Sequence, residues 1–292
     1  MTQPLVVDAH THVFPPEIVE NREAWQARDA WFSLLYQNPK ARLIAADDLI
    51  ASMDQAGIER SVLCGFPWRD SGLCDEHNAY MLDAVRRFPD RLTWLAIVSP
   101  AHGRALSSRT EDLIGSGAAG LGELNADAQG FELSALEAIR PALVMCQDLA
   151  KPVLFHASEP VGHDYPGKGT ATPARLVKLA DAFPRLAIVL AHWGGGLPFY
   201  ELMPEVRAAL ANVCYDSAAS TYLYDFGVFR QVIDLVGASK VLFGSDYPVL
   251  RQDRFLERAR SVAWRDDEER DAVLGGTATR VYGILNTGGE AA

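Results

Sequence analysis

The stretch VVDAHTHVFPP (residues 6–16) decides between the two α/β folds that the rest of the chain allows. An open, doubly wound sheet normally carries a glycine-rich phosphate loop after its first strand, and this stretch places two histidines and two prolines there instead. His10 and His12 are separated by one residue, so in an extended strand both imidazoles point to the same face. Such a pair can hold one metal ion, although two histidines in a turn can also be ordinary polar residues. The other strands have to separate these two interpretations.

Short apolar runs rich in β-branched residues recur along the 292 residues and predict eight strands. Several runs are apolar on both faces, as in the strands of a buried parallel sheet. Helix-like segments alternate with them, at 45–57, 74–88, 134–150 and 171–183. With no linker or low-complexity break, this alternation predicts a single (β/α)8 barrel (TIM barrel) domain over residues 1–292. The predicted strands are 5–10, 60–66, 92–100, 118–125, 151–158, 185–192, 212–218 and 240–248.

The connection after the first strand, residues 13–46, is unusually long for a barrel loop. A long first loop can act as a lid over the active site, or it can be a structural flap whose aromatic side chains pack on the barrel rim. The sequence leaves both roles open, and one segment can fill both. Its aromatic and basic residues are Trp25, Trp31, Phe32, Tyr36, Arg22, Arg28, Lys40 and Arg42.

The composition excludes several classes of partner. A formal net charge of −11 argues against nucleic acid or an anionic membrane as the main partner, because both require a basic surface. No run of about 18 apolar residues occurs, so no membrane span is expected. The first residues lack the basic and apolar regions of a signal peptide. Four cysteines without C-x-x-C spacing fit free thiols, and together these features predict a cytoplasmic protein.

Histidines and acids gather at the ends of the predicted strands. The carboxyl ends of all eight strands meet at one mouth of a barrel, where barrel enzymes place their chemistry. Imidazole nitrogens with carboxylate oxygens form the donor set of a catalytic zinc, or of manganese or iron at similar sites. The pattern therefore predicts a metal site. The strand-end residues are His10, His12, His156, His192, Glu123, Asp216 and Asp246, whereas His102 and His163 fall in loops and His77 in a helix.

Four motifs in this order resemble the amidohydrolase superfamily. They are DAHTH (8–12), LFHAS (154–158), LAHWGG (190–195) and LFGSDYP (242–248). More narrowly, the chain is similar to the amidohydrolase-related branch that includes aminocarboxymuconate-semialdehyde decarboxylase and various hydrolases. The resemblance extends from VVDAHTH at residue 6 to LGGTATRVYGI, which ends at residue 284. Dimers are common among such proteins, so a homodimer is one expectation.

The resemblance implies roles for five residues. His10, His12 and His156 would bind the metal through nitrogen, and Asp246 would be a ligand close to the activated water. His192 would be an acid/base group near that water, or a ligand of a second metal as in binuclear members. The end of the fourth strand has no bridging lysine and offers Glu123 instead. One divalent ion is expected, zinc first and manganese or iron as alternatives. A pair bridged by Glu123 stays open, as does a hydrogen bond or ion pair of Glu123 at the barrel mouth.

Two reactions fit this set of groups. The first is hydrolysis of a small ester, lactone or amide that carries a carboxylate, and the second is non-oxidative decarboxylation. A metal-binding protein or sensor without catalysis is a third interpretation. Loop residues that could contact a small-molecule substrate are Trp68, Arg69, His163, Tyr165, Lys168 and Trp193. Arg69 and Lys168 could hold a carboxylate and Trp68 could cover a ring, although solvated loop charges and a rim aromatic are equally good interpretations.

Overall fold

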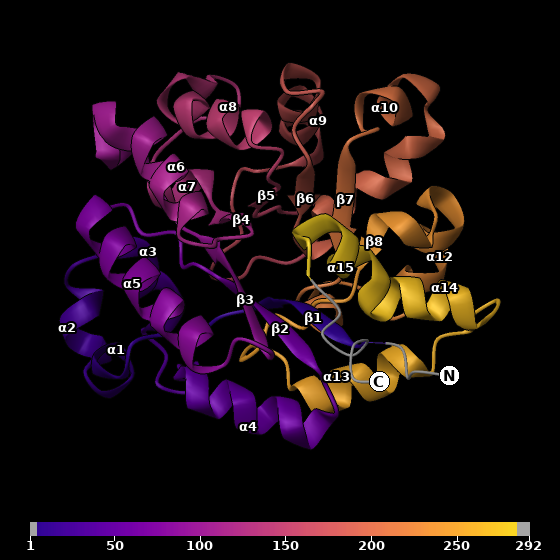
Figure 1. The fold of residues 1–292 in the computed structure, drawn as a ribbon. Coiled ribbons are helices and arrows are strands. Elements are labelled where there is room, and N and C mark those ends of the chain that lie inside the picture. The colour runs from indigo at the N-terminus through magenta and orange to yellow at the C-terminus, as the bar shows by residue number, and fades with distance from the viewer. Residues whose placement is uncertain (1–4, 285–292) are drawn as a thin grey trace, which may run out of the picture.

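Eight parallel strands follow one another in chain order around a nearly closed barrel in the computed structural model, which describes residues 5–284 (Figure 1). The predicted fold is confirmed, and each predicted strand contains or overlaps an observed one. The observed strands are shorter because the loops at the barrel mouth take over the ends of the apolar runs. They are β1 (Val7–Thr11), β2 (Arg60–Cys64), β3 (Leu92–Ala96), β4 (Gly120–Leu124), β5 (Val153–Phe155), β6 (Ile188–Leu190), β7 (Val213–Asp216) and β8 (Val241–Leu242).

The barrel closes where β1 meets the segment that follows β8. The Ala9 amide donates to the Phe243 carbonyl at 2.8 Å, and the Asp246 amide donates to the His10 carbonyl at 2.9 Å. The His12 amide continues this ladder to the Tyr247 carbonyl at 2.8 Å. Residues more than 230 positions apart in the sequence are therefore hydrogen-bonded neighbours. This closure sets Asp246 beside the two histidines of β1.

Helices surround the strands and cover the outer face of the barrel (Figure 1). Each main helix turns an apolar stripe inward, as Leu49 and Met53 of α4 show at i, i+4 spacing. The longer helices are α4 (Ala46–Ala56), α5 (Ser71–Arg87), α6 (Leu106–Gly115), α8 (Arg140–Asp148), α9 (Pro173–Ala182), α12 (Val228–Val236) and α13 (Gln252–Arg260), and the shorter ones are α7 (Ala126–Gln129), α10 (Pro204–Ala209), α11 (Ser220–Leu223), α14 (Asp267–Asp271) and α15 (Thr277–Tyr282). None of these helices is both long and apolar enough to cross a membrane.

The interior of the barrel is packed with side chains and is not a channel. Alternate residues of a barrel strand point inward, and Val62 and Cys64 belong to a small apolar cluster there, whereas Leu63 between them belongs to the larger core under the helices. Tyr282 of α15 packs against the small cluster. Because apolar side chains fill the barrel interior, a site can form only at the carboxyl ends of the strands, as in other barrels. The four cysteines form no disulfide, which confirms the expected free thiols.

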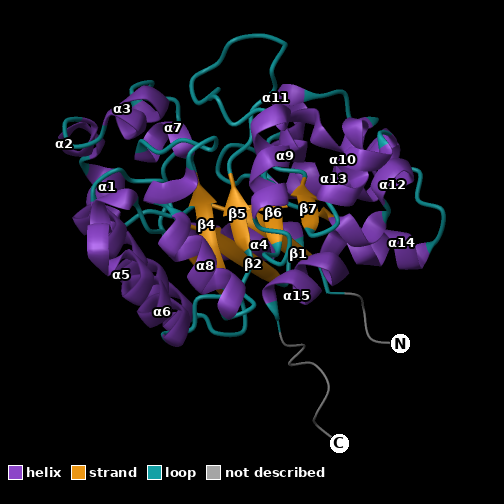
Figure 2. Cartoon of the chain, turned by 90° about the horizontal axis from the view of Figure 1, so that it is seen from above, coloured by secondary structure: helices purple, strands orange, loops and turns teal. Residues whose placement is uncertain are grey.

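The long first connection folds into three helices beside the barrel mouth, α1 (Pro16–Glu20), α2 (Arg22–Gln26) and α3 (Ala30–Tyr36) (Figure 2). Helix α3 begins at Asp29, whose carboxylate accepts the Phe32 amide at 2.8 Å. Phe32 is fully buried and stacks on Trp68 with ring centroids 5.2 Å apart. The segment is therefore anchored to the barrel as a structural flap. Its helix α3 also contributes side chains to the pocket described below.

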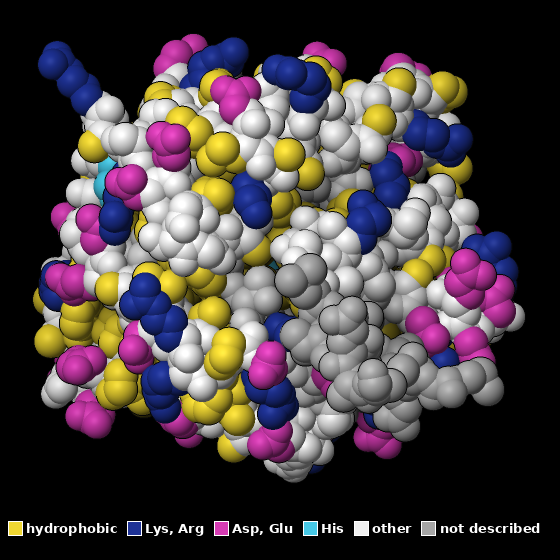
Figure 3. Space-filling view, viewed as in Figure 1, with side chains coloured by type: hydrophobic (Ala, Val, Ile, Leu, Met, Phe, Trp, Pro, Cys, Tyr) yellow, Lys and Arg dark blue, Asp and Glu magenta, His cyan; other side chains and the backbone are white. Residues whose placement is uncertain are grey.

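The face of the molecule seen in Figure 3 mixes acidic and basic side chains without a continuous basic surface. This distribution agrees with the net charge of −11.

Candidate metal centre

The imidazoles of His10 and His12 converge with their Nε2 atoms 3.0 Å apart. The other nitrogen of each ring is occupied: His10 Nδ1 donates to Asp216 Oδ2 at 2.8 Å, and His12 Nδ1 donates to the Cys64 carbonyl at 3.0 Å. Carboxylate and carbonyl oxygens only accept, so we assign the ring protons to Nδ1. In this assignment two Nε2 lone pairs face the same point, an arrangement that a metal ion between them would stabilise. Metal-binding histidines are oriented by their outer nitrogen in this way.

Two carboxylates complete this donor set. Asp246 Oδ1 lies 3.8 Å from His10 Nε2 and 3.5 Å from His12 Nε2. Glu123 Oε2 lies 3.5 and 3.6 Å from the same two nitrogens. Ligand bonds of about 2.0–2.2 Å in a tetrahedral site give donor separations of about 3.3–3.6 Å. Three of the four nitrogen–oxygen separations lie in this range, whereas the 3.8 Å between His10 and Asp246 exceeds it and the 3.0 Å between the two nitrogens falls short of it. The four buried residues therefore fit a zinc-type divalent ion in chemistry and come within about 0.3 Å of its spacing.

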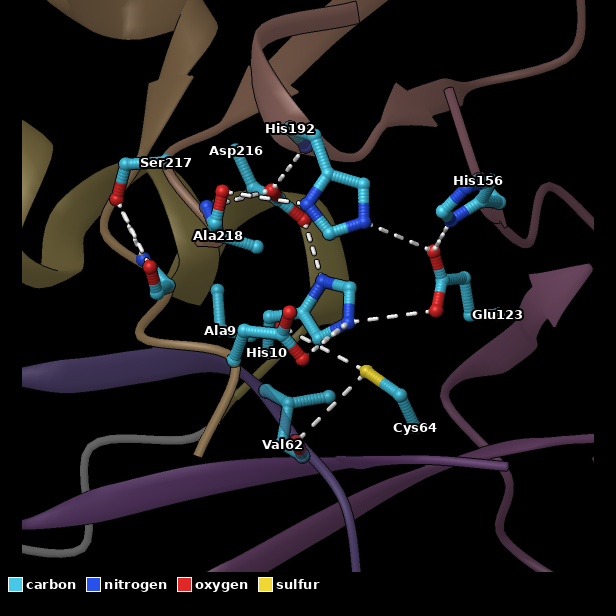
Figure 4. Close-up of polar contacts among 12 residues, drawn as sticks. Ala9, His10, Val62, Cys64, Glu123, His156, His192, Asp216, Ser217 and Ala218 are labelled. Atoms are coloured by element: carbon cyan, nitrogen blue, oxygen red, sulfur yellow. Dashed lines mark hydrogen bonds and ion pairs between the residues drawn. The ribbon is translucent and has the colours of Figure 1, made fainter. Parts of the chain in front are cut away.

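Glu123 also faces a second group of donors through its other oxygen (Figure 4). Its Oε1 accepts from His156 Nδ1 at 2.8 Å and lies 3.4 Å from His192 Nε2. His156 thus stands on the far side of Glu123 from the β1 pair, with its Nε2 3.2 Å from the Gly167 carbonyl. The four-residue set implied by the family resemblance is therefore divided: His10, His12 and Asp246 form one group, and His156 forms another with Glu123 and His192. Glu123 lies between the two.

The electrostatics of the cluster favour positive charge at its centre. Burial lowers the pKa of His192, but the hydrogen bond and charge of Glu123 outweigh burial and raise it to about 9. Burial opposes charge on Glu123 as well, yet the neighbouring His156 and His10 hold its pKa well below the usual value. The pKa of His10 is raised well above its ordinary value, because the acidic groups around it outweigh the effect of burial. A divalent cation satisfies the same demand.

Asp216, at the end of β7, connects His10 to His192 (Figure 4). Its Oδ2 accepts from the His10 ring, while its Oδ1 accepts the backbone amides of His192 and Ala218, each at 3.0 Å. The Ala218 carbonyl in turn accepts from His192 Nδ1 at 3.2 Å. One buried carboxylate therefore fixes both a candidate ligand and the candidate acid/base group. Sequence reasoning placed Asp216 at a strand end but gave it no role.

The backbone is left-handed at two residues of the cluster, His192 with φ of 56° and Asp246 with φ of 62°. Residues other than glycine rarely adopt this conformation, and they do so mainly where the surrounding structure enforces it, often at functional sites. Gly244 lies two residues before Asp246, at a position that leaves little room for a side chain. A Cβ there would lie 2.9 Å from the His10 Cβ. The GSD sequence thus allows the chain after β8 to approach β1 closely.

A pocket of about 290 Å³ opens above the cluster. The 156–172 connection between β5 and α9 rises over this end of the barrel (Figure 2) and brings His163 and Tyr165 to the pocket wall. Two other pocket residues, Trp31 and Leu35, lie on one face of α3 at i, i+4 spacing, a signal that identifies them in the sequence once the helix is recognised. The remaining lining residues are His12, Tyr36, Phe66, Pro67, Glu123, Asn125, His156, Pro166, Gly167, His192, Ala219, Tyr222, Leu223, Asp246 and Val249.

Tyr36, the last residue of α3, was not singled out as a site residue from the sequence. Its ring packs against Phe14, Phe32 and Phe66, with centroids 4.7–6.0 Å away. In the described part of the chain its hydroxyl has no hydrogen-bond partner. Burial, followed by the charge of Asp246, raises the pKa of this phenol, which places the hydroxyl within electrostatic reach of the cluster.

Four of the predicted substrate contacts lie outside the pocket lining. Trp68 is fully buried and donates its indole N–H to His77 Nδ1 at 3.0 Å. Trp193 is also buried and donates to Ser220 Oγ at 2.7 Å. Both side chains pack in the core, where each indole N–H has a hydrogen-bond acceptor. Neither takes the position of a substrate contact.

The two cations expected to hold a carboxylate also point elsewhere. Arg69 is exposed and lies against Gly130, in a separate surface groove. Lys168 Nζ donates to the carbonyls of Val161, Gly162 and His163 at 3.0–3.4 Å. Lys168 therefore stabilises the conformation of its own loop.

Comparisons with known proteins identify the family of the chain. The family described as Amidohydrolase matches residues 7–284, so the chain belongs to this family. An L-fucono-1,5-lactonase of Burkholderia ambifaria is 25% identical, with 97% of each chain covered.

Solved structures share the fold at lower identity. A 5-carboxyvanillate decarboxylase from Novosphingobium aromaticivorans, complexed with manganese and 4-hydroxy-3-methoxy-5-nitrobenzoic acid, superposes with a TM-score of 0.79 at 17% identity, covering 97% of both chains. A probable 2-pyrone-4,6-dicarboxylic acid hydrolase from Acinetobacter baumannii, with citric acid bound, gives a TM-score of 0.67 at 18% identity, covering 96% of this chain and 99% of the other.

Proposed function

We propose that this protein is a metal-dependent hydrolase that opens a small lactone or ester. The observation that carries the proposal is the buried donor cluster, in which Asp246 and His192 both face the pocket. The lactonase relative supports it, since that similarity spans almost the whole of both chains. His10, His12 and Asp246 would hold the ion, with Glu123 as a further ligand. Zinc suits these nitrogen and carboxylate donors, and manganese is the alternative because structural neighbours contain it.

When bound, such an ion polarises a substrate carbonyl and acidifies a water molecule. Asp246 accepts the proton of the attacking water as the water oxygen bonds to the acyl carbon. The bond between that carbon and the leaving oxygen then breaks. His192, whose Nδ1 faces the Ala218 carbonyl, donates a proton from Nε2 to the leaving alkoxide. The products are a carboxylic acid and an alcohol, joined in one molecule when the substrate is a lactone.

Tyr36 also lines the pocket, and no described residue is a hydrogen-bond partner of its hydroxyl. We propose that this hydroxyl donates a hydrogen bond to a substrate oxygen. A donor of this kind stabilises the negative charge that develops on the acyl oxygen during attack.

Decarboxylation is the second candidate, because the manganese-containing structural neighbour is a decarboxylase. In that reaction His192 or Asp246 would protonate the ring carbon before carbon dioxide leaves. The test is a direct comparison on the zinc- and manganese-loaded protein: acid release from a panel of lactones and esters against carbon dioxide release from aromatic and muconate-type acids. We expect acid release, and carbon dioxide release without lactone or ester hydrolysis would reject the proposal.

A further inference from the structure

The walls of the pocket are mainly aromatic and aliphatic. Helix α3 supplies Trp31 and Leu35, the segment after β2 supplies Phe66, and the 156–172 connection supplies Tyr165. Tyr222 of α11 adds a further ring at the mouth, where it is 59% exposed. Flat side chains on several sides favour a flat ring between them, through offset or edge-to-face contacts.

Lysine and arginine are missing from these walls among residues 5–284, although His12, His156, His163 and His192 do line the pocket. The two cations that the sequence offered for a carboxylate, Arg69 and Lys168, lie in a surface groove and on loop carbonyls respectively. The pocket does contain the carboxylates of Glu123 and Asp246. A carboxylate on the distal part of a substrate would therefore meet no lysine or arginine in a pocket that already contains two carboxylates, which opposes its binding.

Two polar side chains of the pocket already have hydrogen-bond partners in the protein. The side-chain oxygen of Asn125 already accepts the amides of Asp127 and Ala128 at 3.0 and 3.1 Å. The Tyr165 hydroxyl donates to Glu159 at 2.8 Å, so the residue presents its ring to the pocket. A sugar lactone would exchange several hydrogen bonds with water for apolar contact, and each unmade bond opposes binding.

We propose that the substrate is a neutral acyl compound with an apolar or aromatic ring, such as an aryl-fused lactone, and is neither a carboxylated nor a polyhydroxylated one. This inference rests on the proposed function for the reaction and specifies its substrate class. It replaces the sequence-based expectation of a carboxylated substrate, because the cations on which that expectation depended lie outside the pocket.

Matched lactones test the inference on the metal-loaded protein. Dihydrocoumarin, dihydrocoumarin-6-carboxylate and L-fucono-1,5-lactone differ in ring charge and hydroxylation. We expect kcat/KM for dihydrocoumarin to exceed that of each of the other two by about tenfold or more, the effect of one unpaired charge or several unmade hydrogen bonds. Equal or faster turnover of the carboxylate or of the sugar lactone would overturn the inference and leave the proposed hydrolytic function intact.

Two leucines of α3 provide a matched pair of variants. Leu35 lines the pocket, and its Cδ2 lies 3.0 Å from the place where a Cβ on Gly167 would stand. Leu34 is 40% exposed and lines the neighbouring groove instead. Leu35→Arg should reduce the preference for dihydrocoumarin over its carboxylate at least about fivefold, whereas Leu34→Arg should leave it unchanged. Equal effects of the two variants would contradict the assigned wall.

Binding separates failure of the inference from failure of the proposed function. Chroman and chroman-6-carboxylate cannot be hydrolysed at an acyl group, and calorimetry measures their binding without turnover. Tighter binding of chroman by about tenfold supports a neutral ring site even if no lactone is opened. Equal or tighter binding of the carboxylate, or binding of neither compound, overturns the inference.

Discussion

Replacement of Asp216 by asparagine is expected to weaken metal binding although Asp216 is not itself placed as a ligand. The carboxylate accepts from His10 Nδ1 at 2.8 Å and from two backbone amides at 3.0 Å. In Asp216→Asn the amide oxygen can still accept the backbone amides of His192 and Ala218. Its NH2 group then faces His10 Nδ1 and can only donate. The His10 proton is thereby moved to Nε2, the atom that points at His12.

The size of the effect follows from this change of tautomer. Loss of a hydrogen-bond partner behind a metal-binding histidine costs about 10- to 100-fold in metal affinity, or about 1.4–2.7 kcal/mol. We expect Asp216→Asn to fall in this range while the barrel stays folded, since the Asn oxygen keeps the backbone bonds. The assay is a competition titration of zinc between the protein and a chromophoric chelator, with circular dichroism to check the fold.

Asp8→Asn is the matched control. Asp8 is equally buried and lies on β1 with His10, but it accepts from Ser245, Gln252 and the His10 backbone, and not from an imidazole. It should lower thermal stability and change zinc affinity less than about threefold. A zinc affinity of Asp216→Asn within twofold of the wild type would refute the reasoning.

Three further outcomes are expected. His192→Asn should lower kcat for lactone opening by about 10²–10⁴ while zinc content stays unchanged, and loss of zinc would assign His192 to the ligands. Tyr36→Phe should lower kcat/KM about tenfold without changing zinc affinity, because it removes one donor to the substrate; unchanged kinetics would exclude that donor. Glu269 accepts from Arg230 and Arg265 at 2.6–3.0 Å, and the hydrogen bond from Arg230 comes first among the causes that lower its pKa to about 2. Because the pKa of Glu269 is lower in the folded protein, the ionised carboxylate stabilises the fold at pH values above its ordinary pKa of 4.5. This stabilisation is lost as the pH falls towards 2. In urea titrations, Glu269→Gln should therefore be less stable by about 1–3 kcal/mol at pH 6 and equal to the wild type near pH 2; a difference independent of pH would contradict this.

The fold and the convergence of the donors could be predicted because they depend on periodicity. Apolar runs alternate with helical segments, and a barrel brings all strand ends to one mouth. His10, His12 and Asp246 therefore had to lie close together once the barrel closed, and the hydrogen bond between the Asp246 amide and the His10 carbonyl shows how. These relations depend on the backbone and need no knowledge of side-chain rotamers.

The pocket walls could not be predicted in the same way. Whether a loop side chain enters the pocket depends on partners far away in the sequence. Trp68 turns into the core because His77 accepts its N–H, and Lys168 turns to three carbonyls of its own loop. His156 is a similar case, since its ring follows Glu123 Oε1 instead of the β1 histidines. The sequence shows that these residues are polar or aromatic, but it does not show in which direction their side chains point.

The central claim is that this barrel opens a lactone by means of a divalent ion held by His10, His12 and Asp246. The most direct measurement is the rate of dihydrocoumarin hydrolysis as zinc is added stepwise to metal-free protein. We expect negligible turnover without zinc and a linear rise in rate that ends at about one equivalent of zinc. Full turnover by the metal-free protein would contradict it.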